Sequence, residues 1–283
     1  MWTVEPPSVT AAEGATASAK GIRERALRAR VSDAVTEFAA NSVKLQADIH
    51  AQALHKVNSS GYQVTGLSDA ELKKLYKDQL SRRGSKARYV YDHVMANARH
   101  SLCSYCQYGI ANSLDHFIPI TVVPALAIDP WNLVPACDRC NKLLLDSFSD
   151  NALRQLLHPY ADPAPLSTST RWLRAHVHPG PEPVVAFHAD PDSNLAPAVR
   201  TRITRQFEQL QLAALFQVVS ARELSGTRAR LTELFPGGQT APVAAHLAEL
   251  SADALAADAN DRRGVMYEAL AADTWFTATG YEV

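Results

Sequence analysis

The sequence predicts an α+β fold in which helices predominate and a short cysteine-containing segment lies between them. Apolar residues recur at a spacing near 3.6 across residues 22–57, which is typical of an amphipathic helix. Residues 184–188 form a β-branched run bounded by prolines, which favours a strand. All four cysteines lie in two Cys-x-x-Cys pairs within residues 103–140. These observations favour a mostly helical body around one small module.

Length and composition limit the classes of protein to which the chain can belong. Its 283 residues, 47% of them hydrophobic, suffice for one large domain or two modest ones. Proteins that coat nucleic acid are usually far more basic than this chain, whose net charge is −1, so a nucleic-acid contact must be local or shared with a partner. The sequence shows no signal peptide and no apolar run of about 18 residues, so we expect a cytoplasmic protein without a membrane span.

The first hundred residues are predicted to form an arm followed by helices. Residues 1–20 are rich in Ala, Thr, Ser and Pro, which is typical of a flexible or wrapping arm. Residues 21–100 predict a helical region. Within it, Ser68 and Glu71 have the spacing of a capping box, which would begin a helix that ends near residue 80. After a turn at residues 82–85, a further helix is expected before the first cysteine pair.

The remaining residues are predicted to form the module and a second helical region. The module is expected to span residues 101–160, with Asp150 capping a short helix that ends near residue 158. Residues 161–283 predict a mainly helical region after the strand, with breaks near residues 236–238 and 259–260. We expect the helices before and after the module to pack together as one body.

The two cysteine pairs predict a structural zinc site. Four thiolates complete the tetrahedral shell that zinc prefers, and here they would come from Cys103, Cys106, Cys137 and Cys140. Paired spacing without a secretion signal favours zinc over disulfides. Two disulfides or four buried free thiols are the alternatives. The 30 residues between the pairs, 107–136, leave room for a hairpin.

Polar residues between and after the cysteine pairs form a candidate hydrolytic set. A neutral imidazole such as that of His116 can take a proton from water at physiological pH. Mg²⁺ or Mn²⁺ prefers oxygen ligands and keeps several waters, so the carboxylate of Asp115 and the carboxamide of Asn141 would suffice to bind it. Successive strand residues point to opposite faces, so Asp115 and His116 cannot both project the same way from a regular strand.

These residues together carry a resemblance. The pattern Cys-x-x-Cys, Asp-His-x-x-Pro and Asn-Leu-Val-Pro-x-Cys-x-x-Cys-Asn-Lys resembles the HNH endonucleases of the ββα-metal class, in the subgroup with a four-cysteine zinc. The resemblance implies that His116 is the general base and that Asp115 and Asn141 bind the catalytic Mg²⁺ or Mn²⁺. It implies that Asn132 braces the loop and hairpin. Many relatives have His where this chain has Asn141, and asparagine still offers an oxygen ligand.

The resemblance also implies a substrate and suggests a partner. It spans about 45 residues and implies metal-dependent cleavage of DNA with 5′-phosphate and 3′-hydroxyl products. A looser resemblance, which also includes residues 157–160, is to stand-alone bacterial HNH proteins. Some of those proteins are similar to the nuclease half of Septu-type anti-phage systems. Those systems work with an ABC-type ATPase, so an ATPase or sensor partner is a further expectation. The alternative is a non-catalytic zinc module that binds nucleic acid or protein.

Charge is unevenly distributed along the chain. Residues 71–88 contain seven Lys or Arg and two acids, whereas residues 249–283 contain seven acids and two arginines. The basic run is either a solvated helix face or a surface that contacts phosphate. Tyr105 is expected to pack around the zinc, and His176, His178 and His188 are treated as incidental because no other ligand is spaced with them.

Overall fold

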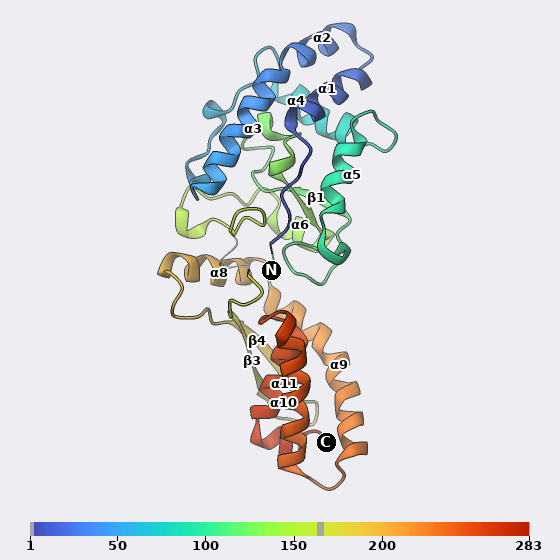
Figure 1. Ribbon diagram of the computed structural model, residues 1–283, viewed down its shortest axis with the longest axis vertical. Helices are drawn as coiled ribbons and strands as arrows, with labels where there is room; N and C mark the ends of the chain where they lie inside the picture. Colours follow the sequence, from blue (N-terminus) through green and yellow to red (C-terminus); the bar gives the residue numbers. More distant parts are fainter. Residues whose placement is uncertain (1–2, 163–166, 283) are drawn as a thin grey trace. The chain divides into compact units, whose positions relative to one another are not determined.

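The computed structural model describes residues 3–162 and 167–282, and the chain divides into two compact units (Figure 1). The first unit is Met1–Leu166 and the second is Ser167–Val283. The expected single body is therefore wrong, and each side of the chain has its own core. The fold is α+β as predicted, with helices and two two-stranded antiparallel sheets among the described residues. No helix in the described ranges is long and apolar enough to cross a membrane.

The N-terminal part of the first unit is helical, and its predicted helix boundaries are largely confirmed. The capping box is present, since the Ser68 hydroxyl accepts from the Glu71 amide and the Glu71 carboxylate accepts from the Ser68 amide. The helix that it begins continues through a π-helical turn at Leu75–Leu80. The helices of this part are α1 (Ala11–Gly21), α2 (Arg25–Asp33), α3 (Val35–His50), α4 (Asp69–Lys74) and α5 (Arg88–Ala96).

The segment predicted to be a flexible arm contains α1, so that prediction is wrong. A second capping box starts the helix, formed by Thr10 and Glu13, whose Thr-x-x-Glu spacing is visible in the sequence. Small residues on one side of α1, such as Gly14 and Ser18, are buried because they let the backbone approach its neighbours closely. A composition typical of linkers here belongs to a tightly packed helix.

Two strands and a helix form the centre of the first unit. The strands β1 (Ser113–His116) and β2 (Leu133–Ala136) pair antiparallel, with Asp115 opposite Val134 and His116 opposite Leu133. Helix α6 (Asp138–Leu144) follows β2 directly. In Figure 1 this ββα element lies between α3 and α5. The short helix predicted after Asp150 is wrong, since only a 3-10 turn, Ala152–Arg154, forms there and Asn151 caps it.

The described residues of the second unit, 167–282, pack four α-helices, a π-helical turn at Phe276–Gly280 and a β-hairpin around aromatic side chains. Its hairpin pairs β3 (Leu173–His178) with β4 (Val184–Ala189), which confirms the predicted strand and adds a partner that the sequence did not predict. The Trp172, Phe207 and Phe216 rings contact one another in series in its core. The helices are α8 (Pro197–Gln209), α9 (Leu212–Leu234), α10 (Thr240–Ala257) and α11 (Arg262–Ala272), with breaks where the sequence predicts them.

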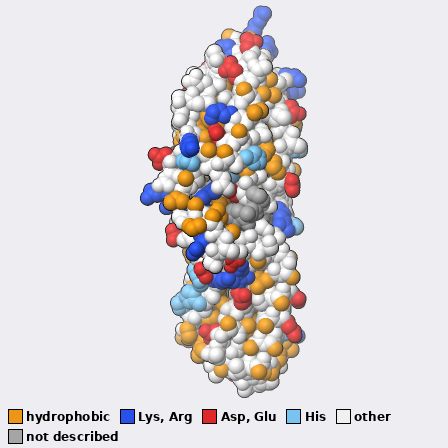
Figure 2. Space-filling view, turned by 60° about the vertical axis from the view of Figure 1, so that its left-hand side comes forward, with side chains coloured by type: hydrophobic (Ala, Val, Ile, Leu, Met, Phe, Trp, Pro, Cys, Tyr) orange, Lys and Arg blue, Asp and Glu red, His pale blue; other side chains and the backbone are white. Residues whose placement is uncertain are grey.

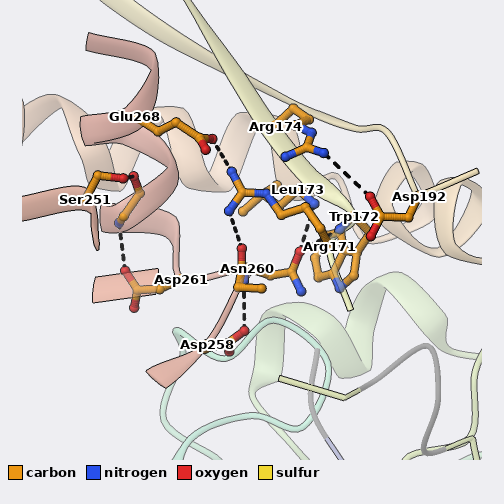
Figure 3. Close-up of polar contacts among 12 residues, drawn as sticks. Arg171, Trp172, Leu173, Arg174, Asp192, Ser251, Asp258, Asn260, Asp261 and Glu268 are labelled. Atoms are coloured by element: carbon orange, nitrogen blue, oxygen red, sulfur yellow. Dashed lines mark hydrogen bonds and ion pairs between the residues drawn. The ribbon is translucent and has the colours of Figure 1, made fainter. Parts of the chain in front are cut away.

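The buried side chain of Asn260 joins the corner between α10 and α11 to the start of β3 (Figure 3). Its Oδ1 accepts from the backbone amides of Trp172 at 2.8 Å and Leu173 at 2.9 Å. Its Nδ2 donates to the carbonyl of Thr170 at 2.6 Å. Nearby, Arg171 donates to the carbonyl of Ala259 and pairs with Glu268. One amide group thus satisfies three backbone groups that would otherwise be unpaired in the interior.

We predict that Asn260→Ala destabilises the second unit by about 2–4 kcal/mol, because two buried N–H groups lose their acceptor. Urea unfolding, with hydrogen exchange at the amides of Trp172 and Leu173, measures the effect. Asn260→Asp keeps an acceptor for both amides but loses the Nδ2 donor to Thr170, so the protection of these two amides should persist although part of the stability is lost. Equal losses in both variants would show that the shared acceptor is not what matters.

Candidate functional site

The four cysteines converge on one point in the first unit. Their Sγ atoms all lie within 4.8 Å of one another, and all four side chains are buried. The sulfurs of Cys106 and Cys137 are 3.9 Å apart, too far for a disulfide. Two thiolates bound to one tetrahedral zinc at about 2.3 Å would lie ~3.8 Å apart. The cluster can therefore hold a structural metal ion such as zinc, and all four cysteines are free of disulfides in the structure.

Backbone turns bring the two cysteine pairs to this point. The first pair lies on a tight loop in which the Cys103 amide donates to the Gly109 carbonyl and the Gly109 amide donates to the Cys106 sulfur. Cys137 is the N-cap residue of α6 and Cys140 lies in its first turn. A Cβ on Gly109 would lie 2.8 Å from the Cys137 sulfur, so only glycine allows this approach. Loop and helix are thus held together at the base of the hairpin.

The thiols are crowded enough to shift one another's protonation. Hydrogen bonding with the Cys103 thiol lowers the pKa of Cys106, lowers that of Cys137 to about 6 and raises that of Cys140, whereas hydrogen bonding with Cys106 raises the pKa of Cys103. Sulfurs that share protons in this way are suited to a dication, which would keep all four as thiolates.

Asp115 lies beside this cluster and contacts one of its tyrosines. The Tyr105 hydroxyl, from the loop between Cys103 and Cys106, donates to Asp115 Oδ2 at 2.7 Å. Burial raises the pKa of Asp115 to about 7, and the hydrogen bond from Tyr105 opposes that rise. A nearby cation would favour the ionised carboxylate. The cysteine loop therefore positions a candidate oxygen ligand.

His116 ends β1 and projects to the other side of the strand from Asp115, as alternation requires. Its Nε2 lies 2.9 Å from the carbonyl oxygen of Ala127, and its ring packs edge-on against Tyr76 with centroids 4.3 Å apart. A carbonyl only accepts, so Nε2 must carry the proton and Nδ1 keeps its lone pair. Burial lowers the pKa of His116 to about 4, so the ring is neutral at physiological pH.

Asn132 clamps the loop that joins the two strands. Its Oδ1 accepts from the Ile118 amide at 2.7 Å, and its Nδ2 donates to the carbonyls of Ile118 and Leu126. The side chain is 1% exposed, so these bonds are not exchanged with water. The clamp holds residue 118, just after His116, against residue 126, just before the carbonyl that orients the imidazole. Asn132 therefore braces the histidine without touching it.

Asn141 lies on α6 and faces the start of β1. Its Nδ2 donates to the Ser113 hydroxyl at 3.1 Å. Ser113 and Asp115 are two residues apart and share a strand face, so Asn141 approaches the face that bears Asp115. No hydrogen bond from the described residues reaches Asn141 Oδ1, so this oxygen is available as a ligand for a metal ion.

Sequence reasoning located the polar residues but missed their supports. Tyr105 was expected only to pack around zinc, yet it orients Asp115, and Tyr76 was not singled out although its ring covers His116. The Ala127 carbonyl has no signature in the sequence at all. A tyrosine within a Cys-x-x-Cys loop was the one available signal.

We predict that Cys140→Ser reduces bound zinc from one ion per chain to none under a chelator challenge. Structural zinc contributes about 10–16 kcal/mol in small zinc-finger peptides, so the first unit should lose its cooperative unfolding transition. Elemental analysis and thermal unfolding measure both effects. Tyr108→Phe, an exposed change in the same loop, is the control and should alter neither. Retention of zinc by the serine variant would contradict the four-thiolate site.

Comparisons with known proteins add one distant relative. No protein-family model matches the chain, and no solved structure is significantly similar to it. The chain is similar to Protein ea31 of Escherichia phage lambda, with 27% identity over 173 residues. The match covers 60% of this chain and 58% of that protein, less than two thirds of its length. The relative's name states no activity.

Proposed function

We propose that the first unit is a metal-dependent HNH endonuclease that hydrolyses DNA phosphodiester bonds. The observation that supports this most strongly is the arrangement of His116, whose Nε2 faces a backbone carbonyl and whose Nδ1 keeps a lone pair. It ends a strand that also bears Asp115 and lies in a hairpin closed by four thiols. Position, tautomer and charge all suit a general base.

In this proposal His116 Nδ1 takes a proton from the attacking water. The imidazole is neutral because burial lowers its pKa, so it is ready to accept a proton at physiological pH. Its orientation is fixed by the Ala127 carbonyl, and the Asn132 clamp fixes that carbonyl in turn. The loss of Asn132 would therefore misplace the base without removing it.

Asp115 and Asn141 would hold Mg²⁺ or Mn²⁺ through one carboxylate and one carboxamide oxygen. Their donor atoms suit such an ion, because it prefers oxygen ligands and keeps several waters. The ion, when bound, would neutralise charge on the scissile phosphate and the leaving oxygen. Tyr105 positions Asp115 from the cysteine loop, so the structural and catalytic centres share a support.

We propose DNA as the substrate and an ATPase or sensor protein as a partner. The net charge of −1 favours an enzyme that acts with an ATPase or sensor, as in an anti-phage defence system, over one that binds DNA avidly by itself. The alternative is a non-catalytic zinc module. It is favoured by the packing of the His116 ring against Tyr76, which limits access to the imidazole.

We predict that purified, zinc-loaded protein cleaves plasmid DNA with Mg²⁺ or Mn²⁺ and that His116→Ala lowers the rate by about 100-fold or more. His188→Ala removes an exposed histidine from the second unit and should leave cleavage unchanged. Zinc content and the melting curve confirm that each variant is folded. Cleavage that is equally fast in His116→Ala would rule out the base. Absence of cleavage by the wild type would favour the partner-dependent enzyme or the binding module.

A further inference from the structure

A basic pocket lies in the first unit outside the ββα element. It has a volume of about 600 Å³ and is formed where the end of α1 meets the turn after residue 80. Five cations line it and only one acid, Asp78, accompanies them; the cations are Lys20, Arg23, Arg82, Arg83 and Lys86. All five are exposed, and none forms an ion pair with any described residue. Like charges that gather without counterions favour an anionic ligand.

The shape of the pocket comes from two segments that are far apart in the sequence. Lys20 and Gly21 end α1 and Arg23 follows it, whereas the other cations follow the π-helical turn. The Gln79 side chain lies directly against Gly21, where a Cβ would clash with its oxygen. Gly84 has a φ of +78°, which lets the chain turn so tightly that Arg82, Arg83 and Lys86 flank one hollow. The cations are thus brought together by the fold and not only by their order in the sequence.

The same helical segment connects this pocket with the candidate catalytic site. Tyr76, whose ring packs against His116, lies three residues before Gln79, which lines the pocket. The residue that covers His116 and a residue that lines the pocket therefore belong to the same π-helical turn, Leu75–Leu80. A strand of nucleic acid presents a phosphate at every nucleotide, so one strand could contact both places.

The face of the molecule shown in Figure 2 does not offer a broad basic surface to nucleic acid, so the attraction for phosphate must come from a local pocket. On that face, blue cationic and red acidic side chains are interspersed and form no continuous basic surface. With a net charge of −1, the chain has no general attraction for a polyanion. Five cations with one acid provide the attraction locally.

We propose that this pocket binds the phosphodiester backbone of the nucleic acid next to the nucleotide that is cut. The inference rests on the proposed function for its substrate, but it concerns binding and not chemistry. Lys and Arg contacts to phosphate give affinity without sequence selectivity, so the pocket would position the strand and select no base.

The test is equilibrium binding of a fluorescent DNA duplex to the zinc-loaded full chain without Mg²⁺ or Mn²⁺, followed by anisotropy. The variant changes Arg82, Arg83 and Lys86 to Gln. The control changes Arg25, Arg28 and Lys56 to Gln, three exposed cations of the same unit outside the pocket, so its net charge is the same. We expect the pocket variant to bind at least about tenfold more weakly at moderate salt. A plot of log K against the logarithm of the salt concentration should become less steep for this variant, by about 2 or more in slope, because each phosphate contact contributes ~0.9.

Three outcomes would overturn the proposal. In the first, both triple variants weaken DNA binding equally; in the second, the wild-type protein does not bind DNA. In the third, the pocket variant loses the binding of tripolyphosphate but keeps that of DNA. The last outcome would assign the pocket to a small free phosphate compound. Cleavage assays separate this proposal from the nuclease itself. Wild type that binds through the pocket but never cuts would support the pocket and count against a nuclease that acts without a partner. Cutting with normal DNA binding in the pocket variant would refute the pocket alone.

Discussion

The convergence of four cysteine sulfurs is the constraint on which the first unit depends. One pair lies on the loop before β1 and the other at the start of α6, so their approach closes the open end of the hairpin, where β1 begins and β2 ends. A two-stranded sheet is marginal by itself in water, and strands of four residues are short even for one. A metal ion held by these four thiolates would replace the core that such a small element lacks. It also fixes the loop that holds Tyr105 and, through it, the carboxyl group of Asp115.

The other candidate site residues lie on the two opposite sides of β1. One side bears Ser113 and Asp115 and receives Asn141 from α6, so oxygen donors gather there. The other bears His116, whose ring is held by a carbonyl and covered by Tyr76. Asn132 connects them, since its three hydrogen bonds set the path of the chain between the strands. The surrounding helices are therefore part of the site, because Tyr76 belongs to the N-terminal helical region and not to the module.

Local rules in the sequence predicted much of this structure, whereas long-range packing did not follow from them. The Ser68 capping box, the strand at residues 184–188 and the breaks in the last helices depend on neighbouring residues and are confirmed. Cysteine spacing predicted the cluster for the same reason. The helical state of α1 was missed although its capping box, Thr10 and Glu13, is a local signal, because its small residues have the composition of a linker and their burial does not follow from composition. The β3 strand and the division into two units also depend on tertiary contacts. In the candidate site, side-chain identities were predictable but the Ala127 carbonyl and the Tyr105 bond were not, since neither follows from spacing.

The central claim is that Asp115 and Asn141 bind a divalent ion on the strand that ends at His116, on a frame held by a separate structural metal. Mn²⁺ binding to zinc-loaded protein, followed by electron paramagnetic resonance, tests it most directly because it requires no substrate or partner. The account predicts one Mn²⁺ per chain, with binding lost in Asp115→Asn and retained in His116→Ala. Zinc content should be the same in all three proteins. Mn²⁺ binding that survives Asp115→Asn, or that is absent from the zinc-loaded wild type, would contradict the account.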